Sequence, residues 1–198
     1  MGKYTMIADV GERLTQVLQR ELVPEVIPNP NEIGLRSPEE HGDVSLGLFL
    51  YDVRLSEEIS QPGLAVIRNE RIQKIPVYLT LYYMVTAYSS GDVKYRLAQE
   101  ERILGKVIQT FHDYPVIPLG EVDAEKISGT DIHISMLRMN ADEKARIWNF
   151  PGIGNRLSLF YKVTPVAIDS GLHSDFTRVT DMDINVGYRN ERGNSSIK

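Results

Sequence analysis

The chain has 198 residues, of which 42% are hydrophobic and 25% charged, with a net charge of -5 and no cysteine. This balance is typical of one soluble globular domain, and the lack of cysteine excludes disulfides and thiolate metal sites. Without a large basic excess, we expect neither nucleic acid nor an anionic membrane surface as a partner. The N-terminus lacks a signal-peptide core, and no run reaches the roughly 18 apolar residues of a membrane span, so we expect folding in the cytoplasm.

The N-terminal segment predicts an amphipathic helix that begins at Thr5 or Asp9 and runs to about Leu22. Its apolar residues recur at spacings of three and four, which places them on one stripe of a helix. Three prolines then end the helix and force an extended, turning connection, because proline cannot continue the hydrogen-bond ladder. These prolines are at positions 24, 28 and 30.

Residues 44–55 predict the first strand, because apolar side chains occupy both sides of an extended run. We expect one side to carry Val44, Leu46, Leu48 and Leu50, and the other Phe49, Tyr51 and Val53. Gly47 within the run indicates a bulge or a close backbone approach. Residues 56–75 are polar and irregular, so we expect a long excursion, which in a compact domain is usually functional or locally disordered.

A long strand with two different faces is predicted for residues 76–88. One face is apolar: Val77, Leu79, Leu81, Tyr83, Val85 and Ala87. The other combines aromatic rings with hydroxyls: Tyr78, Thr80, Tyr82, Met84, Thr86 and Tyr88. Such a surface suits contact with another protein, because tyrosine offers a large apolar ring with a polar tip. We therefore name Tyr78, Tyr82 and Tyr88 as interface candidates. The alternative is that a helix of the same chain covers this face.

The strongest helix prediction covers residues 94–112, with Asp92 as its N-cap and the segment 113–115 as its end. At about 1.5 Å per residue, a helix of this length can lie across a whole small sheet. We expect its buried stripe to contain Leu97, Leu104, Ile108 and Phe111, widened by Ile103 and Val107.

The remaining elements are two strands and a short helix. Residues 127–139 and 156–169 have strand patterns, and Pro165 in the second indicates an edge or a bulge. Between them, Asn140 and Glu143 have the spacing of a capping box. That box opens a short helix that carries Ile147, Trp148 and Phe150.

The C-terminal segment contains a last strand pattern, far from the others in sequence. Its alternating apolar residues are Met182, Ile184, Val186 and Tyr188. We expect this segment to complete a sheet in its own subunit or in a neighbour's, and we name these four as further interface candidates. The whole order predicts a single α+β domain with a mixed or antiparallel sheet, one long helix and two shorter ones. We place the domain at residues 1–171 and the tail at residues 172–198.

The sequence names no catalytic residue, no cofactor and no metal site. The histidines at 41, 112, 133 and 173 lack metal-ligand spacing, and the glycines at 152 and 154 fit a turn better than a dinucleotide loop. Adjacent carboxylates such as Glu100 and Glu101 point in different directions on a helix, so we interpret them as solvated charge. A hydrolase that uses His41 or His133 with a carboxylate stays as an alternative without support from a motif.

Six framework segments in this order carry a family resemblance over about residues 5–171. They are MIADVGERL, LGLFLYDVRL, IPVYLTLYYMVTAY, RILGKVIQTFHDYPVI, MNADEKARIWNF and RLSLFYKVTPVAIDSG. Together they resemble the cap, or tail-terminator, protein family of extracellular contractile injection systems. These are phage-tail-like devices that include the anti-feeding prophage and the Photorhabdus virulence cassettes. Each motif is only weakly specific, but their order and spacing together are fairly specific.

The resemblance implies a non-enzymatic structural protein with a phage tail-terminator-like fold. Such a protein forms a ring, by expectation a homo-hexamer, on the distal end of the inner tube and the last sheath ring. It ends assembly and stabilises the sheath, and its partners are itself, the tube protein and the sheath protein. The particle is assembled in the cytoplasm and can be released. The other reading is a monomeric adaptor that binds a peptide or partner by strand addition.

Overall fold

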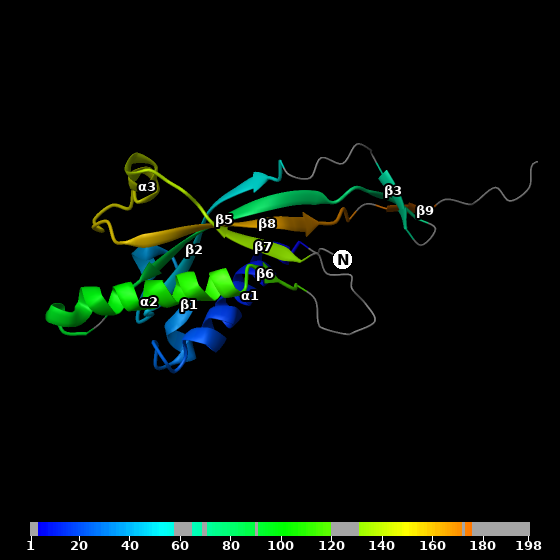
Figure 1. Cartoon of the computed structure of the whole chain (residues 1–198). Coiled ribbons are helices and arrows are strands. Elements are labelled where there is room, and N and C mark those ends of the chain that lie inside the picture. Colours follow the sequence, from blue (N-terminus) through cyan, green and yellow to red (C-terminus); the bar gives the residue numbers. More distant parts are fainter. Residues whose placement is uncertain are drawn as a thin grey trace, which may run out of the picture.

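The computed structural model describes residues 4–57, 65–68, 71–89, 91–119, 131–171 and 173–175, and it confirms the α+β prediction. Its main sheet is six-stranded, in the order β1-β2-β5-β8-β7-β6 (Figure 1). The strands are β1 Ile33–Leu35, β2 Leu46–Leu55, β5 Val77–Ala87, β6 Val116–Ile117, β7 Ile132–Met136 and β8 Ser158–Ile168. The α-helices of the described residues are α1 Met6–Leu22, α2 Val93–Asp113 and α3 Ala141–Ile147.

The main sheet is mixed, as predicted: β1 runs parallel to β2, and all other neighbours are antiparallel. A second, three-stranded sheet has the order β3-β4-β9. Its strands are β3 Ala65–Arg68, β4 Arg71–Lys74 and β9 His173–Asp175. The prediction of an irregular excursion over residues 56–75 is therefore wrong for β3 and β4. Each of these strands has only four residues, which is too short for a strand pattern to be recognised among the polar residues around it.

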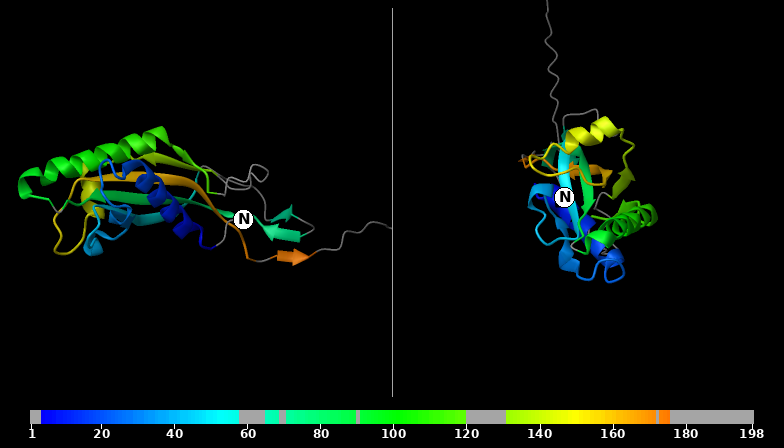
Figure 2. Two further views of the ribbon diagram at one scale, coloured as in Figure 1. Left: turned by 90° about the horizontal axis from the view of Figure 1, so that it is seen from below. Right: turned by 90° about the vertical axis from the view of Figure 1, so that its left-hand side faces the viewer.

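Helices α1 and α2 cover one face of the main sheet, and α3 lies on the other (Figure 2). We call the side with α1 and α2 the helix face. Its core joins Val10, Leu14 and Leu18 of α1, Ile103 and Val107 of α2, and Leu81, Tyr83 and Val85 of β5. Burying one such aliphatic side chain stabilises the fold by about 1.5–3 kcal/mol, so this layer is the main source of stability.

Both predicted helix caps are present. The Asp92 side chain accepts a hydrogen bond from the Lys94 backbone N–H at 3.3 Å. The Asn140 side chain accepts from the Glu143 N–H, and the Glu143 carboxylate accepts from the Asn140 N–H, which completes the predicted capping box.

The buried stripe of α2 differs from the predicted one. Its buried residues are Glu100, Ile103, Leu104, Val107, Thr110 and Phe111. Leu97 is 70% exposed and Ile108 is also exposed, so both are wrong as core residues. Ile108 lies at the side of the stripe. Leu97 lies in the first turns of the helix, which reach beyond the ends of the strands (Figure 2).

β2 contains a bulge, and the side chains that follow it lie on the opposite faces from those predicted. The register with β5 shifts between Leu50 and Asp52, so that Val53 pairs with Leu81 and Leu55 with Leu79. Directly opposed residues share one face of an antiparallel pair. Val53 therefore lies on the helix face, and not with Phe49 and Tyr51, because one extra residue in a strand reverses the alternation.

Pro165 also lies at a bulge. In the pairing of β5 with β8, Leu79 pairs with Val166 and Leu81 with Val163, which leaves two residues of β8 opposite Thr80. The sequence predicted that Pro165 lies either in an edge strand or at a bulge. The edge strand is wrong, because β8 lies between β5 and β7. The bulge is confirmed, and it removes the need for a ladder N–H that proline lacks.

Gly47 marks a close approach, as predicted. A Cβ at this position would lie 3.2 Å from Cε2 of Tyr88, whose ring lies against the backbone of β2. The contact fixes Tyr88 at the end of β5, next to the turn into α2.

A buried carboxylate fastens the same end of the sheet to α2. Glu100 is 9% exposed, and its Oε1 accepts hydrogen bonds from the Ser89 backbone N–H at 3.1 Å and from Arg156 Nη1 at 3.0 Å. The interpretation of Glu100 as solvated charge is wrong, whereas its neighbour Glu101 is exposed. Glu100 joins the helix, the turn before it and the start of β8.

We expect Gly47→Ala to destabilise the protein by about 1 kcal/mol, because the new methyl group must displace the Tyr88 ring. Gly34→Ala in the neighbouring strand β1 is the matched control, since a Cβ there has nothing within 4 Å. Thermal unfolding of both variants checks this. An unfolding temperature of Gly47→Ala at or above that of the parent protein would contradict the close approach.

We expect Glu100→Ala to lower the free energy of unfolding by about 2–3 kcal/mol, because it leaves a buried N–H and a guanidinium without their acceptor. Glu101→Ala, one residue further along the same helix, is the control and should change stability by less than about 0.5 kcal/mol. Urea unfolding measures both. Equal effects of the two substitutions would show that the Glu100 contacts contribute little.

Candidate interaction surfaces

The face of the main sheet opposite α1 and α2, which we call the tyrosine face, is covered in part by the chain itself. Met84 and Phe160 form a buried cluster there with Trp148, which follows α3. Half-buried hydrophobic residues surround this cluster: Phe49, Tyr51, Leu137, Met139, Ile147, Phe150 and Ile153. For this half of the face, the alternative of an intramolecular cover is the correct one.

The other half of the tyrosine face contains Tyr78 and Tyr82, both half-buried. Beside them lies a row of hydrogen-bonded hydroxyls, in which Thr80 Oγ1 donates to Thr164 Oγ1 at 3.2 Å. Ser56 Oγ lies 3.5 Å from the same Thr164 oxygen. These small side chains form hydrogen bonds with one another, so the larger tyrosines provide the accessible part of the surface.

Tyr82 lies in an arrangement of aromatic and charged groups that spans β2 and β5. The Arg54 guanidinium carbon is 5.0 Å from the centre of the Tyr82 ring, and Arg54 Nε donates to Asp52 at 2.7 Å. The Tyr51 ring is 6.1 Å from the Tyr82 ring. Burial, with the Asp52 charge beside it, raises the pKa of Tyr51 to about 12, so this phenol stays neutral. The group forms a preorganised, amphipathic surface of the kind that protein partners contact.

Tyr88, the third tyrosine among the interface candidates, directly follows β5, lies inside the subunit and is only 6% exposed. Its ring stacks on His41 with centroids 4.2 Å apart, and the Arg156 guanidinium lies 5.4 Å from its centre. Burial is the main cause that raises the pKa of Tyr88. We therefore remove Tyr88 from the candidate surface, because its aromatic face already has partners in the same chain.

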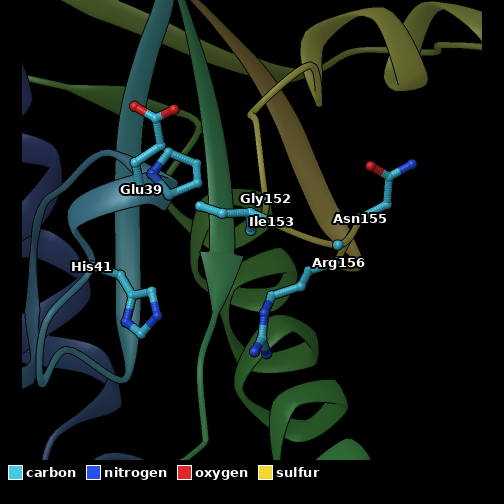
Figure 3. Close-up of a pocket in the computed structure, with 8 residues that line it drawn as sticks. Glu39, His41, Gly152, Ile153, Asn155 and Arg156 are labelled. Atoms are coloured by element: carbon cyan, nitrogen blue, oxygen red, sulfur yellow. The ribbon is translucent and has the colours of Figure 1, made fainter.

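A pocket opens beside Tyr88 at this end of the sheet (Figure 3). It has a volume of about 560 Å³ and is lined by Pro38, Glu39, His41, Gly152, Ile153, Gly154, Asn155 and Arg156. Its cation, Arg156, is already paired with Glu100. Among these lining residues there is therefore no unpaired arginine with which to hold an anion. The lining comes from two segments, residues 38–41 and the loop at residues 152–156 before β8.

The two histidines of the hydrolase alternative lie apart and on different elements. His41 stacks on Tyr88, and its Nδ1 is 2.9 Å from the Gly42 carbonyl oxygen. His133 is exposed on β7, opposite Thr164. Among the residues that the structure describes, no group of three histidines or carboxylates is placed to hold a metal ion. No helix in the described ranges is long and apolar enough to cross a membrane.

The tail candidates Met182, Ile184, Val186 and Tyr188 lie outside the described residues, so their interface role stays a prediction. The last described segment, β9, pairs with β4 of the same chain. The boundary between residues 171 and 172 likewise stays a prediction.

Sequence reasoning missed the contacts that join distant segments. Arg54 on Tyr82, His41 on Tyr88 and Arg156 on Glu100 each connect residues 28 to 56 positions apart. No periodicity signals such pairs. The one local signal was Gly47 in a strand, which pointed to a close approach without identifying Tyr88 as the neighbour.

Comparison with solved structures shows the same fold in two proteins. One structure is described as a PVC sheath/tube terminator in the extended state, from an extracellular contractile injection system. It aligns with a TM-score of 0.69 and 16% identity, over 98% of this chain and 67% of that chain. The second is the tube-terminating cap of the anti-feeding prophage, with a TM-score of 0.64 and 19% identity, over 90% of this chain and 61% of that chain. This chain thus spans about two thirds or less of the length of either protein.

No curated protein matches the chain closely enough to count as a relative. The model of one protein family, however, matches residues 9–181, which is most of the sequence. The matched range contains all six strands of the main sheet, and the match confirms the resemblance drawn from the framework segments. The chain therefore belongs to the Pvc16 N-terminal domain family.

Proposed function

We propose that the protein is a terminator cap of a contractile injection system. In this role, six copies form a ring on the distal end of the inner tube and the last sheath ring. The ring ends tube growth and stabilises the extended sheath. The observation that carries the proposal is the family match over residues 9–181, together with the likeness of the fold to two terminators.

The surfaces of the subunit are compatible with this role. A ring protein needs two different lateral surfaces that fit each other, and a further surface for the tube or sheath. The uncovered half of the tyrosine face, around Tyr78 and Tyr82, is our candidate for the tube or sheath contact. Its charged and aromatic groups are held in place by Asp52 and Tyr51, which lowers the entropy lost on binding.

The same proposal names the partners and the place of action. The partners are further copies of the protein itself, the tube protein and the sheath protein of the particle. Assembly takes place in the cytoplasm, and the cap leaves the cell as part of a released particle. Within the tail, residues 172–198, β9 pairs with β4 of the same chain, and the segment with Met182, Ile184, Val186 and Tyr188 is proposed to add a strand to a neighbouring subunit.

Removing the protein from an otherwise complete particle should give tubes of uncontrolled length and an unstable sheath, since nothing then closes the growing end. Electron microscopy of negatively stained particles measures the length distribution and the fraction of contracted sheaths. Supplying the parent chain in trans should restore a single length. Particles of normal length and sheath state without the protein would refute the capping role.

Replacing Tyr78 and Tyr82 by serine should reduce the fraction of capped particles several-fold, because both rings leave the proposed contact surface. Tyr114→Ser is the matched control: Tyr114 is also partly exposed, and the Arg20 guanidinium lies 5.0 Å from its ring, as Arg54 does from Tyr82. Cap occupancy is counted by microscopy, and the unfolding temperature of the free subunit is measured in parallel. Normal capping with a lowered unfolding temperature would mean that the two tyrosines serve only their own subunit.

A further inference from the structure

The first turns of α2 carry apolar side chains that find no core in their own subunit. Val93 is 76% exposed and Leu97 is 70% exposed, and Tyr95 between them is exposed as well. Val93, Leu97 and the buried Leu104 follow one another at spacings of four and seven, so they lie on one side of the helix. The first turns of α2 extend past the ends of the strands (Figures 1 and 2), and we call the exposed residues Val93, Tyr95 and Leu97 the α2 overhang.

A second uncovered apolar group lies at the other end of the sheet. It consists of Val53, Leu55 and Val77, of which Leu55 is 71% exposed. The register places Val53 opposite Leu81 and Leu55 opposite Leu79, both on the helix face. This group, the far-end patch, therefore belongs to the same layer of the subunit as the α2 overhang.

The two groups cannot meet within one subunit. β5 starts at Val77, in the far-end patch, and ends at Ala87, six residues before α2 begins. Leu79, which is opposite Leu55, is eight residues from Ala87, a length of about 26 Å in a strand. One copy thus presents two apolar surfaces at opposite ends of one layer, which is the condition for a head-to-tail contact between copies.

Charges of both signs lie beside the two groups. At the α2 overhang, Lys94 lies in the first turn of the helix, between the N-cap carboxylate of Asp92 and Glu101, which follows Leu97 by four residues. The far-end patch is flanked by Glu57 and Asp169, with Lys74 as the nearby cation and Arg54 already paired with Asp52. Among these groups, Lys94 at the overhang and Glu57 beside the patch are exposed charges of opposite sign that two copies can bring together.

We propose that the α2 overhang of one copy packs on the far-end patch of the next, and that this contact is the lateral interface of the ring. The inference rests on the proposed function, because only in a closed ring of identical copies are the α2 overhang and the far-end patch of every subunit both covered. Leu97 and Leu55 are the central residues of the contact. The interface is heterologous, so no residue of the overhang meets its own counterpart.

The absence of cysteine in the chain makes the pairing directly testable. The double variant Leu55→Cys with Leu97→Cys is assembled into particles with the tube and sheath proteins, oxidised, and run on a non-reducing gel. A disulfide requires Cα atoms about 4.4–6.8 Å apart, so the two new thiols can join only between copies. We expect a ladder of covalent oligomers that ends at the size of the ring. Both sites are exposed, so the variant should keep the parent fold.

The single variants and one mismatched pair are the controls. Leu97→Cys alone and Leu55→Cys alone should stay monomeric on the gel, and Leu97→Cys with Ser135→Cys should give no ladder, since Ser135 lies exposed on the tyrosine face. Dimers of the Leu97→Cys single variant would overturn the head-to-tail arrangement. Capped particles that carry a ring but yield no ladder would overturn this interface and leave the proposed function intact. Particles in which the parent chain forms no ring would refute the proposed function, and the interface with it.

A charge placed in the contact gives an independent measurement. Leu97→Asp should reduce ring formation at least tenfold, because it buries an unpaired carboxylate beside Leu55 of the next copy. Ile108→Asp on the same helix is the matched control, exposed and apolar but outside the overhang. Equal ring formation by both variants, with equal unfolding temperatures, would contradict the proposal.

Discussion

The burial of β5 on both faces and along both edges is the constraint on which the rest of the structure depends. Its neighbours β2 and β8 pair with it over almost its whole length. On one face, Leu81, Tyr83 and Val85 contact the layer of α1 and α2, and on the other Met84 packs under the segment that follows α3. Since each face is closed by a different part of the chain, one strand fixes the positions of three helices.

The same constraint explains which parts of the surface are left for partners. Near its C-terminal end, β5 is closed on both faces, and Tyr88 becomes part of the subunit through His41, Arg156 and Gly47. Further toward its start, the helices and α3 no longer cover the sheet. Tyr78 and Tyr82 lie on one side there, and the far-end patch lies on the other. Because these uncovered regions are on opposite faces, the proposed contact with tube or sheath and the proposed contact between copies need not compete.

Local patterns in the sequence predicted the fold class, the helix caps and the long strands, because each of these depends on residues close together in the chain. The predictions failed where a contact between residues far apart in the chain determines the position of a side chain. The bulge after Leu50 reverses the face of Val53, and no periodicity reveals where an extra residue enters a ladder. Leu97 has the right spacing for the core, but the helix is longer than the sheet it covers. Glu100 is buried because Arg156 lies opposite, 56 residues away. Tyr88 lies inside the subunit for the same reason, because His41 and Arg156 from distant segments contact its ring.

We propose that this chain caps a tube as a ring of identical copies. The most direct measurement is a cryo-electron microscopy average of particle ends assembled with and without the protein. We expect one closed ring of six copies at the distal end, in contact with both tube and sheath, and no such density when the protein is omitted. Density from a single copy, or a ring located elsewhere on the particle, would contradict it.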